Sequence, residues 1–277
     1  MANIYMRYID GKAKAFTISY DDGTIWDKKM LDLMKEYGIK GTFNLNSGRM
    51  TPEFKTDSEI FIPIKEDEAY DFYPKEYCSI ASHSKDHPTL TKLSVTQITE
   101  QLHDDRVSLE KIFKCFIKGH VIPNGPYDDT VIGIGKLCGF KYIRCTDSTL
   151  SLDFPKTFFP WQPTCAASNV EKCGSISEKF ITETPTSEPF LFYVWGHAHF
   201  LEERGKWQYV VDLFKKVSFK DDVWYATNDE IVDYTERFNS LEWSADFKTV
   251  YNPSVTPVWF FANGATHSVN PGETYTY

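Results

Sequence analysis

Apolar, strand-like segments alternate with helix-like segments through most of this 277-residue chain. The predicted strands are residues 13–19, 41–46, 78–82, 115–122, 141–146, 190–195 and 223–227, and the predicted helices are residues 27–37, 94–113, 128–137, 206–216 and 229–238. Strands that alternate with helices usually pair in parallel within one sheet. About seven such units therefore predict an α/β fold whose sheet closes into a barrel or nearly so.

The pattern changes from about residue 241 onward. Two short apolar segments, residues 258–261 and 266–269, flank the turn signal Asn263-Gly264, which is typical of a β-hairpin. We therefore divide the chain into a barrel over residues 1–240 and a small β-rich extension over residues 241–277 that packs on it.

Charge and hydropathy narrow the range of partners. The formal net charge is −9 and no basic run is longer than a lysine pair, which argues against nucleic acid. No segment approaches the roughly 20 apolar residues of a membrane-spanning helix. Residues 1–11 lack the apolar core of a signal peptide. We expect a cytoplasmic protein, or a secreted or cell-surface one if an export signal was removed; the oligomeric state is left open.

The six cysteines contain no C-x-x-C pair, so a thiolate zinc site is not expected. Cys165 and Cys173 flank a short loop and are placed to form a disulfide if the protein is exported.

Polar side chains recur where the predicted strands end. In an α/β barrel, functional residues collect at these strand ends, so side chains from several strands meet at one rim. The residues in question are Asp21, Asp22, His83, His87, Asn124, Arg144 and His197. Taken singly, each aspartate or histidine has an ordinary structural explanation, whereas their joint placement predicts one functional site.

The two motifs Ser19-Tyr20-Asp21-Asp22-Gly23 and His83-Ser84-Lys85-Asp86-His87 supply two imidazoles and two carboxylates. The spacing of the two histidines predicts that both rings lie on one face of a helical turn. Three ligands of this kind leave a coordination position open for water, as in catalytic zinc sites. The remaining carboxylate is then a candidate base for that water, which predicts a metal-dependent hydrolase.

These motifs resemble those of the polysaccharide deacetylases of carbohydrate esterase family 4, over about residues 13–238. Residues 17–23 resemble the family's Thr-Phe-Asp-Asp-Gly signature, and residues 83–87 fit its His-Ser/Thr-x-x-His motif. The resemblance implies a deformed (β/α)7 barrel in which Asp21 is the catalytic base. It also implies that Asp22, His83 and His87 bind a divalent metal. Zinc is the expected ion, and cobalt, nickel or manganese also suit nitrogen and oxygen ligands.

The family's third motif, Arg-x-Pro-Tyr-Gly, is altered. Residues 121–125 read Val-Ile-Pro-Asn-Gly, so the arginine that tethers the catalytic aspartate is missing. Arg144 is the candidate replacement. The main-chain N–H of Asn124 remains a candidate oxyanion donor, because that role depends on main-chain position. Trp195-Gly196-His197 resembles the late motif that supplies the catalytic acid, and we prefer His197 to His199 because it follows the glycine.

The resemblance implies removal of acetyl groups from an acetylated sugar or glycan, with N-acetylglucosamine units as the expected substrate; whether the acetyl is on nitrogen or oxygen is open. A first alternative is an amidohydrolase of a small-molecule amide, with a lid formed by residues 50–77 or 148–189. A second is a non-catalytic carbohydrate-binding relative, for which the altered third motif is the only support.

Overall fold

The structure is a computed structural model that describes residues 4–277. Its centre is a sheet of eight strands in the order β6-β5-β4-β3-β2-β8-β7, with β9 also paired to β2. All the pairings are parallel. The strands are β2 (Lys14–Asp21), β3 (Gly41–Leu45), β4 (Cys78–Ser82), β5 (Gly119–Val121), β6 (Tyr142–Arg144), β7 (Cys165–Ala166), β8 (Phe190–Gly196) and β9 (Val223–Tyr225). The predicted α/β fold is confirmed, and the sheet forms a half-barrel.

Strand β2 is the axis of this sheet, and every one of its residues is buried. Strand β8 pairs with β2 over residues 14–20. The other edge of β2 pairs first with β9, over residues 14–16, and then with β3, over residues 18–21. Because β3, β4 and β8 run parallel to β2, their carboxyl ends lie on the same side of the sheet as Asp21.

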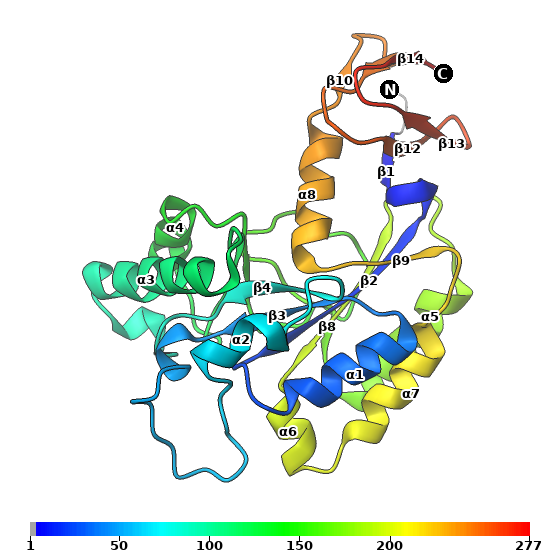
Figure 1. Cartoon of the computed structure of the whole chain (residues 1–277). Helices are drawn as coiled ribbons and strands as arrows, with labels where there is room; N and C mark the ends of the chain where they lie inside the picture. The colour runs from blue at the N-terminus through cyan, green and yellow to red at the C-terminus, as the bar shows by residue number, and fades with distance from the viewer. Residues whose placement is uncertain (1–3) are drawn as a thin grey trace.

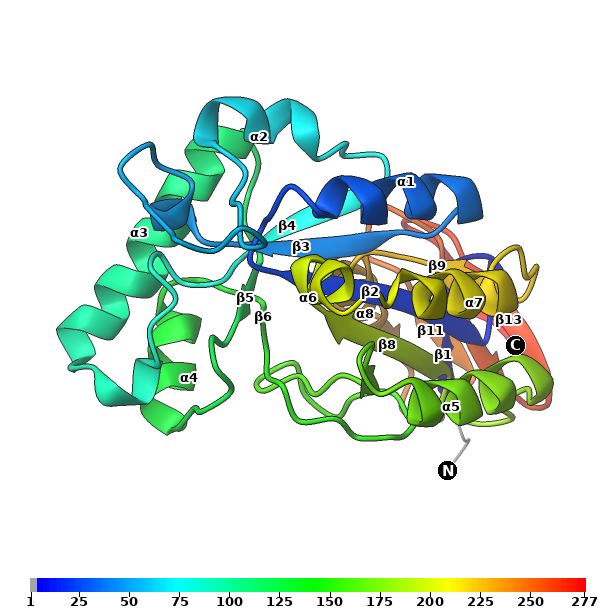
Figure 2. The same ribbon diagram turned by 90° about the horizontal axis from the view of Figure 1, so that it is seen from below.

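Helices surround the sheet, as Figure 2 shows. They are α1 (Asp27–Tyr37), α2 (Glu66–Phe72), α3 (Val95–Phe113), α4 (Asp129–Leu137), α5 (Val170–Thr182), α6 (Ala198–Glu203), α7 (Trp207–Val217) and α8 (Asn228–Asn239). The sequence predicts five of these eight. Short 3-10 turns lie at Ile9–Gly11, Ser47–Arg49 and Leu90–Lys92. Side chains such as Phe16, Met34 and Phe214 fill the core between the sheet and these helices.

Two helices, α3 and α8, begin with a reciprocal capping box. Ser94 caps α3 in a reciprocal capping box with Gln97, the arrangement that a serine followed three residues later by a glutamine favours. The cap of α8 lies one residue before Asn228, the first residue of the helix. Thr227 takes that place, because its hydroxyl accepts from the N–H of Glu230 and the Glu230 side chain accepts from the N–H of Thr227.

A β-rich region stands apart from the half-barrel at the top of Figure 1. It contains the predicted hairpin, β12 (Val258–Ala262) and β13 (Ala265–Val269), and a second sheet of β10 (Glu242–Trp243), β11 (Thr249–Tyr251) and β14 (Thr274–Thr276). The N-terminal strand β1 (Tyr5–Arg7) pairs with β12, so this region draws on both ends of the chain, and a boundary at residue 240 alone does not delimit it.

Helix α8 joins the two regions (Figure 1). The Tyr234 hydroxyl donates to the Arg7 carbonyl at 2.6 Å and accepts from the Trp259 N–H at 2.9 Å. A second core cluster, which includes Trp161, Tyr193 and Phe260, continues from the half-barrel into the β-rich region. The extension is therefore packed on the sheet and not tethered by a free linker.

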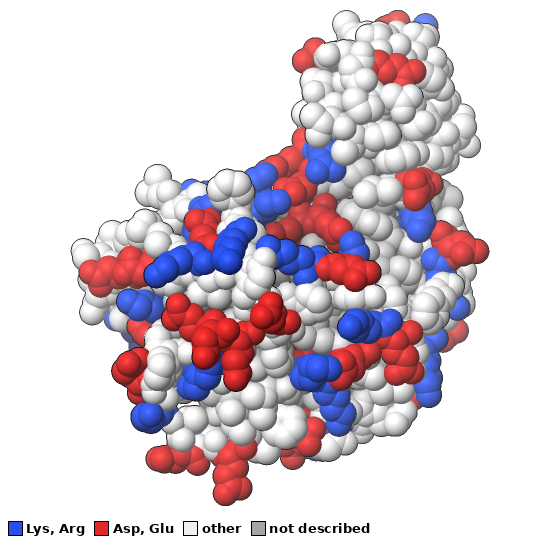
Figure 3. All heavy atoms as spheres, in the orientation of Figure 1, with Lys and Arg blue, Asp and Glu red and all other residues white. Residues whose placement is uncertain are grey.

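Charged side chains of both signs are interspersed over the face in Figure 3, and the β-rich region at the top carries few of them. None of the helices in residues 4–277 combines the length and the apolarity needed to cross a membrane. A disulfide joins Cys165, in β7, to Cys173, in α5.

Candidate active site

The two aspartates leave the carboxyl end of β2 in a tight turn. Asp21 is its last residue, with 2% of its side chain exposed, and Asp22 follows with 7% exposed. Asp22 has φ 81° and Gly23 has φ 62°, both in the left-handed region. The N–H of Asp22 donates to the Asn44 carbonyl at 3.0 Å, which extends the pairing of β2 with β3 by one residue. The turn thus presents two successive carboxylates at the rim of the sheet.

The two histidines follow β4, but not on a helix as expected. Residues 83–88 form a turn in which Ser84 and His87 adopt φ values of 64° and 60°. The Asn46 side-chain amide holds this turn, since its Nδ2 donates to the carbonyls of His83 and Ser84 at 2.5 and 2.7 Å. The two imidazole rings still converge, with centroids 4.7 Å apart. The spacing of the two histidines therefore correctly predicts that their rings converge, but the prediction that they lie on a helical turn is wrong.

Asp22, His83 and His87 form a set whose ligand atoms all lie within 4.8 Å of one another. The His83 Nδ1 pairs with the Val121 carbonyl at 2.9 Å, so Nδ1 carries the proton and Nε2 keeps a free lone pair. That buried Nε2 has no hydrogen-bond partner in the described residues. An orphaned imidazole nitrogen facing a carboxylate fits a divalent cation, and the second nitrogen is fixed as in known metal sites.

The protonation state of the histidines agrees with this assignment. Burial is the main cause that lowers the pKa of His83. Burial, and then the neighbouring His83, lower the pKa of His87 to about 4. Both imidazoles are therefore neutral near pH 7, the form that binds metals.

Asp21 is paired to a buried arginine. Arg144, the last residue of β6, is fully buried and its Nη2 donates to both carboxylate oxygens, at 2.5 Å for Oδ2. Asn44 donates to Oδ1 at 2.7 Å. Burial alone would raise the pKa of Asp21, but Arg144, with His83 and His197, lowers it to about 2. The structure thus pairs Arg144 with Asp21 in a buried ion pair.

Oxygen Oδ2 of Asp21 faces the metal-binding set. It lies 4.0 Å from the His83 Nε2 and 3.8 Å from the His197 Nε2. The His197 Nε2 is also 3.7 Å from Asp22 Oδ2. His197 caps α6 directly after β8, and 20% of its side chain is exposed. One carboxylate oxygen therefore lies between the metal-binding set and a partly solvated imidazole.

His199 also reaches the site. Its Nε2 is 3.9 Å from Asp22 Oδ2, and burial is the main cause that lowers its pKa to about 4. Its side chain is more enclosed than that of His197, with 6% exposed. Both histidines that the sequence singles out are near the aspartates, and His197 is the one with access to solvent and to Asp21.

Asn124 lies in the turn after β5, with φ 61°. Within the described residues its hydrogen bonds use the side-chain amide, whose Nδ2 donates to the Thr89 hydroxyl at 3.3 Å and to the His87 carbonyl at 3.5 Å. The main-chain N–H stays free to donate, as an oxyanion donor requires.

Two residues at the site have no assigned role in the sequence-based prediction: Arg49 is not named there, and Trp195 appears only as part of the motif that contains His197. Arg49 brings its Nη1 to 3.4 Å from Asp22 Oδ1, and its guanidinium lies 5.2 Å from the centroid of the Phe61 ring. Trp195 places its ring 4.6 Å from the guanidinium carbon of Arg144. Both could have been proposed from their positions near the carboxyl ends of strands, because Arg49 follows β3 closely and Trp195 lies near the end of β8.

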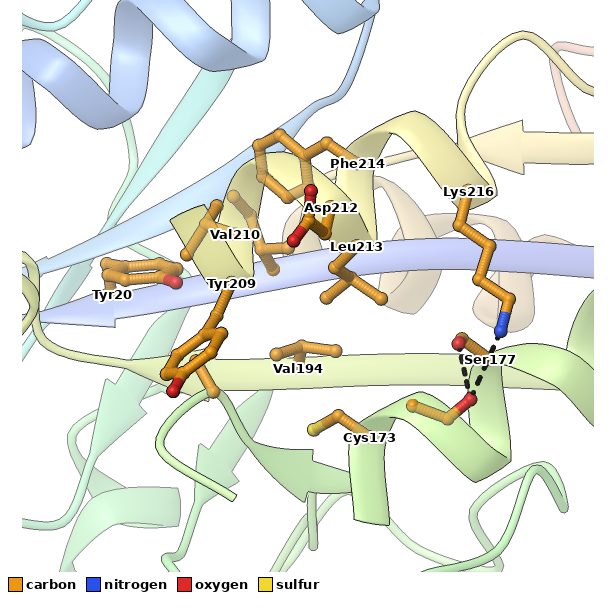
Figure 4. Close-up of a pocket in the computed structure, with 13 residues that line it drawn as sticks. Tyr20, Cys173, Ser177, Val194, Tyr209, Val210, Asp212, Leu213, Phe214 and Lys216 are labelled. Carbon is orange, nitrogen blue, oxygen red and sulfur yellow. Dashed lines mark hydrogen bonds between the residues drawn. The ribbon is translucent and has the colours of Figure 1, made fainter. Parts of the chain in front are cut away.

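A separate apolar pocket of about 230 Å³ lies between α5 and α7, against β2 and β8 (Figure 4). Val194, Val210 and Leu213 line it, and Tyr20 closes the end nearest to Asp21. It contains none of the metal-binding residues, so it is distinct from the active site.

Comparisons with known proteins agree with the motifs. The family model "Polysaccharide deacetylase" matches residues 9–143. The "Uncharacterized protein YlxY" of Bacillus subtilis (strain 168) is 26% identical over 131 residues, which are 47% of this chain and 37% of that protein. This chain thus aligns with little more than a third of the length of that curated relative.

Two solved structures have similar folds. One is BA3943, described as a CE4 family pseudoenzyme from Bacillus anthracis. It is 14% identical to this chain, the match covers 83% of this chain and 68% of that chain, and the TM-score is 0.50. The other is a family 4 acetyl xylan esterase from Clostridium thermocellum in complex with a cobalt ion, with 15% identity, 81% and 92% covered, and a TM-score of 0.51. At these identities the similarity establishes the fold alone. The family model identifies residues 9–143 as a polysaccharide deacetylase domain, and the two solved structures share its fold.

Proposed function

We propose that this protein is a metal-dependent hydrolase that removes acetyl groups from an acetylated sugar or glycan. The observation that carries the proposal is the position of Asp21. Its Oδ2 lies 4.0 Å from the orphaned His83 Nε2, while Arg144 holds both carboxylate oxygens. A base fixed beside a three-ligand metal set is the arrangement that activates water for hydrolysis.

Asp22, His83 and His87 would hold the cation, and we expect zinc, with cobalt, nickel or manganese as alternatives. When bound, such an ion polarises a carbonyl group and lowers the pKa of a water molecule. The remaining steps belong to side chains of this chain.

Asp21 takes the proton from the attacking water at Oδ2, because Oδ1 accepts two hydrogen bonds, from Asn44 and Arg144, whereas Oδ2 accepts one, from Arg144, and faces the metal-binding set. Its low pKa keeps it ionised throughout the neutral range. His197 then donates a proton to the departing amine or alcohol, since it is partly solvated and within 3.8 Å of Asp21 Oδ2. The main-chain N–H of Asn124 donates to the developing oxyanion.

Substitution of the base tests this scheme. We expect Asp21→Asn to lower kcat/KM for acetate release by roughly 10²–10⁴-fold, since general-base catalysis contributes about that much. Zinc affinity, measured by calorimetry, should be retained, because Asp21 is not in the ligand set. Asp104→Asn, at an exposed carboxylate on α3, is the matched control. Full activity in Asp21→Asn would remove Asp21 from the mechanism.

Residues 60–64, between β3 and α2, support a second candidate function, that of a small-molecule amidohydrolase. The Ile25 N–H donates to the Ile62 carbonyl and the Ile64 N–H to the Gly23 carbonyl, both at 2.9 Å, so residues 60–64 border the aspartate turn. The Phe61 ring lies 5.3 Å from His199. A segment on this side would limit the length of a bound substrate, which favours a small amide over a polymer. Hydrolysis of acetylated monosaccharides but not of oligosaccharides would favour this candidate.

The location in the cell is also part of the proposal. We place the protein outside the cytoplasm, because a glycan substrate and the disulfide between Cys165 and Cys173 both suit an oxidising compartment. Alkylation after denaturation without a reductant, followed by mass spectrometry, should leave these two cysteines unmodified and label them only when a reductant is added; labelling of both without reductant would contradict the disulfide and remove this support for the placement.

A further inference from the structure

A pocket of about 200 Å³ opens beside His197, and its lining contains none of the metal-binding residues. The ends of β7 and β8 and the segment from α6 to the start of α7 form it; the residues that matter are Trp195, His197, Phe200, Arg204 and Lys206. Pockets for drug-sized ligands are roughly 300–1,000 Å³, so this one suits a single sugar ring.

Aromatic side chains line the end of the pocket near the catalytic imidazole. The ring centroids of Trp195 and Phe200 lie 5.6 and 4.7 Å from that of His197. A group bound against these rings is therefore held next to His197, where the leaving group receives its proton.

Two cationic side chains also line the pocket, and the guanidinium carbon of one of them, Arg204, lies 5.0 Å from the centroid of the Phe200 ring. Gly205, with φ 59°, turns the chain between α6 and α7, so that Arg204 and Lys206 on either side of it both line the pocket. The residues that line the pocket include no acidic side chain. Neither cation has an ion-pair or hydrogen-bond partner for its side chain within residues 4–277.

Two glutamates, Glu202 and Glu203, precede Arg204, and within residues 4–277 neither forms an ion pair with Arg204 or Lys206. Glu202 is engaged by the Trp207 indole at 2.6 Å and by Lys29 at 3.5 Å. Arg49, the arginine on the opposite side of the site, is already beside Asp22. In a chain of net charge −9, two unpaired cations in one pocket next to the catalytic histidine form a local anion-binding site.

We propose that this pocket is a subsite for a sugar unit that carries an anionic group, a carboxylate or a phosphate, adjacent to the acetylated unit. The proposal rests on the proposed function for the position of the acetyl group. Arg204 supplies the planar fork that matches either anion, Lys206 adds a second charge, and Trp195 and Phe200 contact the apolar face of the ring.

The test compares three acetylated oligosaccharides of equal length: one neutral, one with a uronic acid unit and one with a phosphorylated unit. We expect the wild-type protein to prefer at least one acidic substrate over the neutral one by roughly tenfold in kcat/KM. A preference of this size corresponds to the free energy that one or two charge-assisted hydrogen bonds supply. The substrate with the larger ratio identifies the anion.

The double variant Arg204→Gln/Lys206→Gln should bring this ratio close to one. The double variant Lys111→Gln/Lys248→Gln removes the same charge from α3 and the β-rich region and should keep the wild-type ratio. Acetate release without any acidic preference, or with a preference that survives Arg204→Gln/Lys206→Gln, would overturn the subsite.

Binding to the Asp21→Asn variant separates the two proposals. Calorimetry should detect the acidic oligosaccharide binding more tightly than the neutral one, and the added double substitution should abolish that difference. If this binding is seen but the wild-type protein releases no acetate, the deacetylase function fails while the subsite stands. If acetate is released but binding shows no difference, the subsite fails alone.

Discussion

The two sides of the active site follow different rules. The metal side, Asp22, His83 and His87, matches the family motifs residue by residue and converges within 4.8 Å. On the tether side, Trp195 and His197 still resemble a family motif, but Arg144 departs from the family pattern, because the cation that holds Asp21 comes from β6 instead of the turn after β5.

The difference shows that a metal ligand and a tether for a carboxylate place different demands on the sequence. A metal ligand must offer a particular lone pair at a particular place, so the residue type and its position are both fixed. A tether for a carboxylate must only bring a positive charge to it. Strands β5 and β6 are neighbours in the sheet, with Val121 opposite Arg144, so either can deliver that charge.

The largest effect is expected on the metal side. His83→Ala removes a buried ligand, so we expect zinc affinity to fall by more than about a hundredfold, beyond the 10–100-fold typical of second-shell changes, and acetate release to be lost. His103→Ala, at an exposed histidine of α3, is the control. Unchanged zinc affinity in His83→Ala would show that the cation binds elsewhere.

On the tether side, Arg144→Met should leave Asp21 as a buried carboxylate with Asn44 as its remaining neutral donor. Removing one partner of a buried pair costs roughly 3–5 kcal/mol, and this loss should appear in denaturant unfolding. The acidic limb of the kcat/KM profile should move to higher pH, because the pKa of Asp21 rises. Arg144→Lys keeps the positive charge, so it should lose less unfolding free energy and shift the acidic limb of the kcat/KM profile less than Arg144→Met. Equal changes in the two variants would show that the charge has no role.

The Asp21–Arg144 pair also predicts how stability depends on pH. The folded-state pKa of Asp21, about 2, lies below its usual 3.8, so the unfolded chain takes up the proton first as pH falls. The pair therefore stabilises the fold above pH 4 by about 2 kcal/mol and loses this contribution between pH 4 and pH 2. The difference in unfolding free energy between wild type and Asp21→Asn should shrink over that window. A difference independent of pH would contradict the low pKa.

The smallest effect is expected from Trp195. Its ring supports Arg144, whose Nε and Nη1 have no hydrogen-bond partner among the described residues. Cation–π contacts of buried groups contribute about 2 kcal/mol, so Trp195→Leu should lower kcat by up to roughly tenfold. Trp195→Phe retains an aromatic face and should lose less. Equal effects of the two variants would mean that the ring does not position Arg144.

Much of the half-barrel could be predicted from the sequence, because its buried strands are long apolar segments and the capping box of α3 is a local signal. Strand β7 has two residues and α6 has six, too short for any periodicity to register. The pairing of β1 with β12 joins residues about 250 positions apart and has no local signal at all.

The metal side was predictable for the same reason, since its residues lie in two compact motifs. The contact of Arg144 with Asp21 could be proposed only because a cation was missing elsewhere. Arg49 and the pocket next to His197 depend on how loops fold over the rim, through contacts such as that of Arg49 with Phe61, which no residue pattern encodes.

Acetate release by chelator-treated protein, with and without added Zn²⁺ or Co²⁺, tests the central claim most directly. The substrates are N-acetylglucosamine oligomers and acetylated xylan, which also distinguish an amide from an ester. The account predicts that release from one of them stops on chelation and returns with the metal. Stoichiometric metal binding without release from either substrate would contradict the deacetylase function, and absence of both would favour a non-catalytic carbohydrate-binding protein.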